Sequence, residues 1–265
     1  MQKENLNIDF EIFIIKVLDE SGKIALNYFR QIRDLALKGD ASPVTLADKD
    51  IENYIRSKII SNYPTHNIIG EEFENIKGEE DITWYIDPID GTTNFSRQIP
   101  HFCVSMACLH RGKLLHGVII NPITGEEFVA TRGKGAQLNG KKIRVSSEER
   151  LEGALVASAG SYSDASFQGH AQIVQALVNA GANYREPGSA ALELAAVAAG
   201  RLDGVWMHGL NLWDIAAGCL LIQEAGGLIG DFEGGLDHLA SGNLVAANPK
   251  MFKTLGSLAR QHLAK

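Results

Sequence analysis

Acidic side chains gather at three separated places in this 265-residue sequence, each next to the pattern of a strand or a helix. Gly70-Glu71-Glu72 follows the apolar run 67–69, and Asp87-Pro88-Ile89-Asp90-Gly91-Thr92 follows the apolar run 82–86. Trp213-Asp214 begins a helical pattern much further along the chain. Carboxylate and carbonyl oxygens are the ligands that hard cations such as Mg²⁺ prefer. The residue types therefore predict a magnesium site, with no cysteine or histidine placed to compete for the cation.

The segment from Asp87 to Thr92 has the composition of a cation and anion site. Pro88 is expected to fix a turn in which the two aspartates converge, with the Ile89 carbonyl as a further oxygen ligand. Gly91 lets the backbone approach an anion, and the N–H groups at 91–93 can bind one. Asp-Pro and Asp-Gly are also common turn pairs, so an isolated segment of this kind would equally be an ordinary turn. The acidic segments upstream and downstream favour the metal site.

The overall composition excludes several classes of protein. The net charge of −7, from 25 Lys and Arg against 32 Asp and Glu, argues against binding to nucleic acid or an anionic membrane. An anionic substrate would need a bound cation to attract it. The three cysteines form no C-x-x-C pair, and no signal peptide or long apolar span is evident, so we expect a cytoplasmic protein. The sequence contains no P-loop, no G-x-S-x-G and no H-E-x-x-H motif.

Two halves with different patterns of secondary structure must position these side chains. Residues 1–145 predict an α+β half, with helices at about 8–31 and 45–60, a polar break at 38–43, and strands at 67–69, 82–86 and within 102–129. Asn139-Gly140 predicts a two-residue hairpin turn. Residues 146–265 predict an α/β half, with strands at 154–159, 183–186, 202–207, 228–230 and 244–247, and helices at 167–180, 190–199 and 213–225. Asn248-Pro249 is expected to cap a final helix. Without a low-complexity linker, both sandwich-like halves should form one unit.

Taken together, the acidic motifs resemble the inositol monophosphatase family, the magnesium-dependent, lithium-sensitive phosphomonoesterases. The similarity covers essentially the whole chain and rests on Gly-Glu-Glu at 70–72, Trp-Tyr-Ile-Asp-Pro-Ile-Asp-Gly-Thr-Thr-Asn-Phe at 84–95 and Trp-Asp-Ile-Ala-Ala-Gly at 213–218. This resemblance implies a layered α-β-α-β-α sandwich and usually a homodimer. It also implies a set of magnesium ligands: Glu71, Asp87, the Ile89 carbonyl, Asp90 and Asp214.

The resemblance also implies roles for individual residues. Glu71 is expected to orient the attacking water, shared with the Thr92 hydroxyl and supported by Asp48. A solvated helix residue is the alternative for Asp48, and a helix-start carboxylate is the alternative for Asp214. The expected substrate contacts are Asp90, Gly91, Thr92, Asp214 and the turn Gly188-Ser189-Ala190, for which a plain helix start is the alternative.

Two functions remain open at this point. The first is hydrolysis of a small phosphomonoester, most simply inositol 1-phosphate, with fructose-bisphosphatase, histidinol-phosphatase and nucleotide 3′-phosphatase activities on the same scaffold as alternatives. The second is a regulatory protein that keeps the fold and works through protein or RNA contacts. One departure bears on the substrate, because Met207 stands where typical inositol monophosphatases carry a glutamate that accepts hydrogen bonds from ring hydroxyls. We therefore expect broad activity, unless the adjacent His208 or a water takes over that role.

Overall fold

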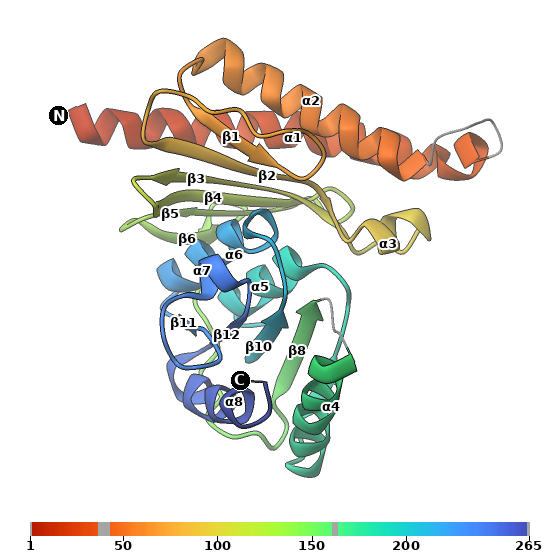
Figure 1. Cartoon of the computed structure of the whole chain (residues 1–265), viewed down its shortest axis with the longest axis vertical. Helices are drawn as coiled ribbons and strands as arrows, with labels where there is room; N and C mark the ends of the chain where they lie inside the picture. The colour runs from red at the N-terminus through yellow and green to blue at the C-terminus, as the bar shows by residue number, and fades with distance from the viewer. Residues whose placement is uncertain (1, 37–42, 161–163, 264–265) are drawn as a thin grey trace.

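The computed structural model describes residues 2–36, 43–160 and 164–263, which form five layers of alternating helices and sheets (Figure 1). Helices α1 (Gln2–Ala36) and α2 (Pro43–Asn62) cover the outer face of a seven-stranded sheet. Helices α5 (Ala190–Ala198) and α6 (Leu212–Glu224) form the middle layer. A five-stranded sheet follows, and α4 (Asp164–Asn179) and α8 (Pro249–His262) cover its far face. The predicted α-β-α-β-α sandwich is confirmed.

The first sheet follows the order of the chain, from β1 to β7. Its strands are β1 (Asn67–Gly70), β2 (Ile82–Asp90), β3 (Cys103–His110), β4 (Lys113–Asn121), β5 (Glu126–Thr131), β6 (Gly135–Leu138) and β7 (Lys141–Lys142). β1 runs parallel to β2, and every later pair is antiparallel; short connections join the strands from β3 to β7. Asn139 and Gly140 both have positive φ, 48° and 74°, which confirms the predicted hairpin turn. The short helix α3 (Thr92–Ser96) lies between β2 and β3.

The second sheet has the order β11-β12-β10-β8-β9. Its strands are β8 (Leu155–Gly160), β9 (Asn183–Arg185), β10 (Gly204–His208), β11 (Leu228–Gly230) and β12 (Leu244–Ala247). Strands β9, β8 and β10 are parallel, as helical crossovers require, and β12 is antiparallel to both β10 and β11. The short helix α7 (His238–Ser241), which the sequence did not predict, precedes β12.

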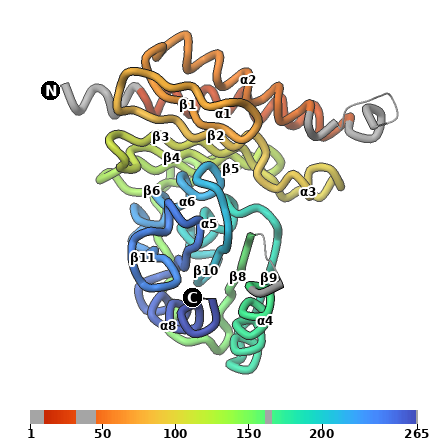
Figure 2. Tube along the Cα trace, viewed as in Figure 1, coloured from red at the N-terminus to blue at the C-terminus, as the bar shows by residue number. Residues whose placement is uncertain are grey.

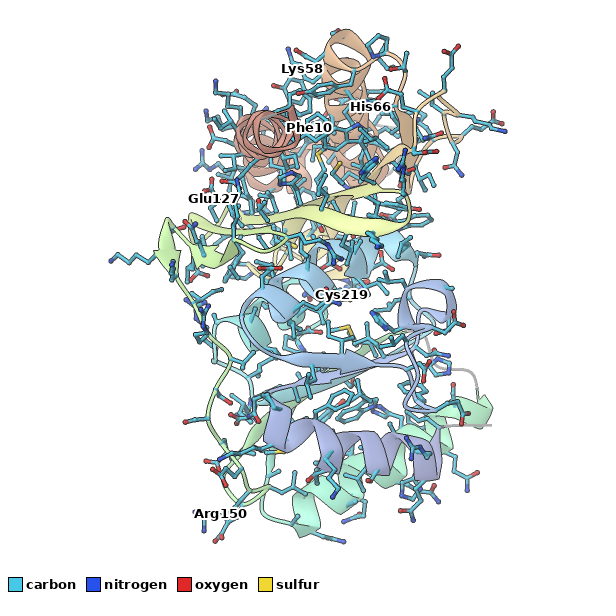
Figure 3. The ribbon with its side chains drawn as sticks, turned by 90° about the vertical axis from the view of Figure 1, so that its left-hand side faces the viewer. Phe10, Lys58, His66, Glu127, Arg150 and Cys219 are labelled. Atoms are coloured by element: carbon cyan, nitrogen blue, oxygen red, sulfur yellow. The ribbon has the colours of Figure 1, made fainter. Side chains whose placement is uncertain are left out.

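Three apolar cores separate the five layers. The first lies between α1, α2 and the seven-stranded sheet and contains Phe10 and Trp84; the second surrounds α5 and α6; the third lies beneath α4 and α8. Figure 3 shows Phe10 in the outer core and Cys219 in the middle layer. A Cβ on Gly117 of β4 would lie 2.8 Å from the backbone of Ala217, so the middle layer packs directly on the first sheet.

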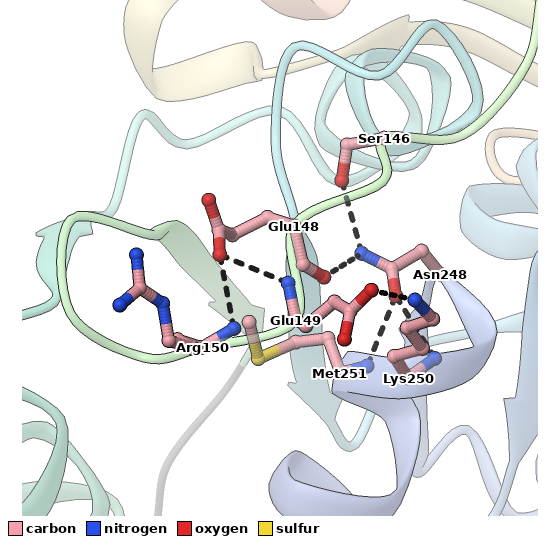
Figure 4. A network of polar contacts seen from close by, with 7 residues as sticks. All are labelled: Ser146, Glu148, Glu149, Arg150, Asn248, Lys250 and Met251. Carbon is pink, nitrogen blue, oxygen red and sulfur yellow. Dashed lines mark hydrogen bonds and ion pairs between the residues drawn. The ribbon is translucent and has the colours of Figure 1, made fainter.

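The connection between the halves is tied to the last helix. Asn248 caps α8 by accepting hydrogen bonds from the Lys250 and Met251 N–H groups, each at 3.0 Å, which confirms the predicted cap. Its Nδ2 atom donates to Ser146 Oγ at 3.0 Å and to the Glu148 carbonyl at 2.9 Å (Figure 4). This asparagine therefore anchors the chain where it passes from one sheet to the other.

The predicted element boundaries are close to those observed, with two notable differences. Helix α1 is longer than the predicted 8–31, and β2 continues four residues beyond the predicted end at residue 86. Most of the polar break predicted at 38–43 lies outside the described residues. The proposed division at 145–146 falls between β7 and β8, and Figure 2 shows the first half above the second, to which the middle-layer helices α5 and α6 belong. Among the helices that the structure describes, none combines the length and the apolar character needed to cross a membrane.

Candidate active site

The acidic motifs of the first half meet because β1 and β2 are parallel neighbours. Gly70 pairs with Ile86, so Glu71 leaves β1 beside the point where β2 reaches Asp87. The expected turn at Pro88 is wrong: β2 continues to Asp90, and the register against β3 shifts between Asp87 and Asp90. Pro88 has no N–H to give to the ladder, and a bulge in the strand accommodates it. The bulge, not a turn, carries the two aspartates.

The Asp90 carboxylate is held by the start of α5, in the other half of the chain. Its Oδ2 atom accepts hydrogen bonds from Ser189 Oγ at 2.5 Å and from the Ala191 N–H at 2.8 Å. Its Oδ1 atom accepts a longer bond from the Ala190 N–H at 3.2 Å. Asp90 therefore satisfies the first amides of α5 and links the two halves of the molecule.

Asp214 enters the site from the first turn of α6. Its Oδ2 atom accepts the Asn211 N–H at 2.7 Å, within a capping box that joins the two residues. The helix-start role and a ligand role are compatible, because this bond occupies one carboxylate oxygen. Asp214 lies near enough to Asp90 that the negative charge of each influences the other.

Glu71 is held through a loop that α2 fixes from behind. Glu52 Oε2 accepts the Glu72 N–H at 2.7 Å, and Glu52 Oε1 accepts Arg56 Nε at 2.6 Å. Arg56 in turn donates to the carbonyls of Phe73 and Glu74, each at 3.0 Å. This buried pair on α2 therefore fixes the backbone on the C-terminal side of Glu71.

Mutual repulsion and burial disfavour the charged forms of these carboxyl groups. Desolvation, followed by the charges of Asp214, Glu72 and Asp90, raises the pKa of Glu71 to about 7. Burial and the charge of Asp90 likewise raise the pKa of Asp214 to about 7. The pKa of Asp87 lies well above its ordinary value through burial and its neighbours Asp90, Glu71 and Asp214.

The pKa values of the remaining two acids of the site are also raised. Burial raises the pKa of Asp90, while the hydrogen bonds from Ser189 and the α5 amides act against that shift. Burial and then the charges of Glu72 and Glu71 raise the pKa of Asp48 to about 8. Charge repulsion of this kind is relieved by a bound cation, which neutralises the carboxylates that it joins.

The oxygen atoms of the site fit a hard cation. Asp87 Oδ1 and Asp48 Oδ1 are buried without a hydrogen-bond partner in the described part of the chain. Such oxygens are costly unless something binds them. Within residues 2–36, 43–160 and 164–263, no three His, Cys, Asp or Glu side chains stand ready as a complete metal group. Asp90 and Asp214 instead direct oxygens to protein N–H groups, so closure around a cation requires side-chain adjustment.

The predicted anion-binding segment is placed next to these acids. Gly91, with φ +94°, precedes α3, and a Cβ there would lie 3.0 Å from the His101 carbonyl and 3.2 Å from that of Gly188. The Thr92 hydroxyl donates to the Ile89 carbonyl at 3.0 Å. Asp48 lies on α2, which packs against α3, but no hydrogen bond joins it to Thr92 among the described residues. The predicted support of Thr92 by Asp48 stays a prediction.

The predicted substrate turn at 188–190 already has partners within the protein. The N–H groups of Gly188 and Ser189 donate to Glu193 Oε1 at 2.9 and 3.0 Å, and that of Ala190 donates to Asp90. This use of Glu193 was not predicted, although a lone carboxylate in the otherwise apolar segment 190–199 was a usable signal.

Asn94 is a further residue that the sequence analysis did not assign a role. Its Nδ2 atom donates to the carbonyls of His101 and Pro187 at 2.8 and 2.9 Å. It also lies 3.3 Å from the Gly188 carbonyl oxygen. Its position directly after Thr93, inside the acidic motif, was the available signal. Glu52 and Arg56 were also missed, and their spacing of four residues on α2 was the available signal.

Comparison with known proteins shows the family to which the chain belongs. The model of the inositol monophosphatase family matches residues 8–264. The chain belongs to the inositol monophosphatase family. Nus factor SuhB of Pseudomonas aeruginosa is 46% identical over 226 residues, which cover 83% of each chain.

Solved structures of the family share the fold. The extragenic suppressor protein SuhB of Bartonella henselae aligns with a TM-score of 0.89 and 33% identity, over 96% of this chain and 100% of that one. The inositol monophosphatase of Anabaena (Nostoc) aligns with a TM-score of 0.86 and 32% identity, over 97% of both chains. Membership of the family confirms the resemblance. Among the similar proteins, some are named as an enzyme, inositol monophosphatase, and others as Nus factor SuhB.

Proposed function

We propose that this protein hydrolyses a small phosphomonoester with the help of Mg²⁺, the cation on which the family generally depends. The observation that carries the proposal is the convergence of Glu71, Asp87, Asp90 and Asp214 beside Gly91 and α3, where burial and the charges of neighbouring acids raise the pKa values of Glu71, Asp87 and Asp214. A site this acidic binds a phosphate only when cations neutralise it.

The four carboxylates and the Ile89 carbonyl would hold the metal. Bound magnesium supplies neutralisation of the phosphate charge and a water of lowered pKa. Glu71 is the choice for orienting a water molecule, because it is the one residue of these four acids that is exposed at the surface. Thr92 already donates its proton to the Ile89 carbonyl, so its oxygen remains free to accept a hydrogen bond from that water. Asp214 would act on the leaving-group side.

The substrate would lie over the start of α3 and between the halves. We assign its contacts to Asp90, Gly91, Thr92 and Asp214, with the backbone of the turn Gly188-Ser189-Ala190 beside them. Met207 lies at the end of β10, fully buried in the middle core. Buried there, its thioether, itself a poor acceptor, presents nothing to a sugar hydroxyl. We therefore propose broad activity on small phosphomonoesters without strong preference for inositol 1-phosphate.

The relatives named Nus factor favour a second candidate, the regulatory role through protein or RNA contacts. On the basis of the family alone, we also propose that the protein is a homodimer, that it is cytoplasmic and that lithium inhibits it.

Phosphate release by the purified protein tests the proposal directly. Inositol 1-phosphate, glycerol 2-phosphate and fructose 1,6-bisphosphate are assayed with Mg²⁺ and after chelation of metal. Asp90→Asn and Asp214→Asn should lower kcat by orders of magnitude, while Glu152→Gln, an exposed carboxyl group in the loop before β8, should not. Absence of magnesium-dependent release from every substrate would overturn the proposal, as would near-normal turnover in either asparagine variant.

A further inference from the structure

The hydroxyl group of Ser189 has an unusual use for a residue at the start of a helix. Serine at this position ordinarily accepts a hydrogen bond from an N–H group one turn into its own helix. Ser189 precedes α5 with extended backbone and makes no such bond. Its hydroxyl instead donates to Asp90 Oδ2, on a strand 99 residues earlier in the chain. The residue is fully buried, which keeps it from touching a substrate in the cleft.

We propose that Ser189 is a positioning residue for the metal site, which fixes one oxygen of Asp90 so that the other can turn to the cation. The inference rests on the proposed function, because it assigns Asp90 as a metal ligand. It explains why the two oxygens of this carboxylate differ so strongly in their surroundings.

Asp90 Oδ2 is surrounded by donors from two elements. Besides Ser189 Oγ at 2.5 Å and the Ala191 N–H at 2.8 Å, the thiol of Cys103 lies 3.6 Å away. Oδ1 has the Ala190 N–H alone, at 3.2 Å. A carboxylate oxygen with two short hydrogen bonds has little capacity left for a cation, whereas an oxygen with one long bond retains it. The geometry thus assigns Oδ2 to the protein and Oδ1 to the metal.

The serine is itself held rigidly. Glu193 Oε1 accepts the N–H groups of Gly188 and Ser189, while Asn94 donates to the carbonyl of Pro187. Gly188 has φ +92°, so a side chain there would be strained, and its Cβ would lie 3.2 Å from Asn94 Nδ2. Since these bonds hold the backbone of the turn, the hydroxyl has a fixed position from which to orient Asp90.

The Asp90 carboxylate also caps the start of α5. The first two helical N–H groups, at Ala190 and Ala191, have no partner within the helix. Both donate to Asp90, which lies where the helix dipole favours a negative charge. Because Asp90 acts as an external cap for α5, the ligand stays oriented only while the middle layer packs against β2 and β3.

The test is Ser189→Ala, which removes the hydroxyl and retains both backbone donors. Binding of Mg²⁺ to the metal-free protein is measured by calorimetry, beside the Mg²⁺ concentration for half-maximal phosphate release. Loss of a group that orients a ligand weakens metal binding by about 10–100-fold, and we expect about tenfold in both measurements. At saturating Mg²⁺, kcat should return close to the normal value, because the ligand itself remains.

Ser21→Ala is the matched control. Ser21 is equally buried, but its hydroxyl donates to the Val17 carbonyl within α1, so metal binding should not change. A merely structural role for Ser189 would lower Tm and leave Mg²⁺ affinity unchanged, which would overturn the inference. The proposed function is judged separately: if the unmodified protein releases no phosphate it fails, while calorimetry on Ser189→Ala and Asp90→Asn still decides whether the serine supports metal binding.

Discussion

Gly70 should not tolerate even a methyl group, because the Glu52 carboxylate occupies the space beside it. A Cβ at position 70 would lie 2.3 Å from Glu52 Oε1, 2.5 Å from Cδ and 2.9 Å from Oε2. The backbone of Gly70 is in the ordinary range for a strand, so space alone decides the outcome. Gly70→Ala must therefore displace a fully buried carboxylate that holds Arg56 and the Glu72 N–H.

The size of the effect follows from those two bonds. Hydrogen bonds to a charged group are worth about 1.5–3 kcal/mol each, and losing both in full would cost about 3–6 kcal/mol. Partial retention after a small shift brings the expected loss to about 3 kcal/mol. Replacement of glycine by alanine also reduces the entropy of the unfolded chain, which offsets about 0.4–1 kcal/mol. We expect a net destabilisation of about 2 kcal/mol, which corresponds to a drop in Tm of about 4–8 °C.

Denaturant unfolding and phosphate release are measured on the same preparations. Because the displaced Glu52 holds the loop after β1, Gly70→Ala should also raise the Mg²⁺ concentration needed for activity through Glu71. Gly256→Ala is the control: Gly256 lies within α8 at ordinary φ, and a Cβ there would meet nothing within 4 Å. That change should stabilise the protein by about 0.5–1 kcal/mol. Unfolding free energy within about 0.5 kcal/mol of the unmodified protein for Gly70→Ala would refute the reasoning.

Three further predictions concern pH, substrate and lithium. Burial, with a smaller contribution from Lys134, lowers the pKa of His116 from 6.5 to about 4. Between these two pH values the unfolded chain binds a proton at His116 that the folded protein does not, so the free energy of unfolding should fall as the pH drops from 6.5 towards 4. Between pH 7 and 4.5, the free energy of unfolding should fall by about 2 kcal/mol less in His116→Gln than in the unmodified protein. An equal fall in both proteins would contradict the lowered pKa of His116. Met207 is fully buried, so Met207→Glu should lower Tm, and it should raise kcat/KM for inositol 1-phosphate relative to glycerol 2-phosphate by turning its carboxylate out of the core toward the substrate, while Met207→Leu leaves both unchanged. A wild-type enzyme already selective for inositol phosphate would show that this position does not set preference. Lithium should inhibit phosphate release at magnesium concentrations that support activity, and full activity in high lithium would place the protein in a less typical branch of the family.

Local patterns were sufficient to predict most elements of the fold. Three predicted features depend on residues within a few positions of each other, and the structure shows all three. They are the helix predicted at 167–180, the cap at Asn248 and the turn at Asn139-Gly140. The same holds for the set of acidic residues, since each follows or begins a predicted element. The turn expected at Pro88 failed because the pairing of β2 with β3 extends the strand past the proline, which local propensity does not contain.

Contacts between distant segments decided the organisation of the site. The sequence by itself determined which carboxylates are present and at which strand and helix ends they stand. It could not show that Ser189 would turn away from its own helix to Asp90, or that Glu52 would fill the space beside Gly70. Those contacts exist because α5 packs between the sheets and α2 packs on the outer face of the first sheet. Burial then makes each polar atom depend on a partner from another layer, and only the tertiary structure determines which partner lies within reach.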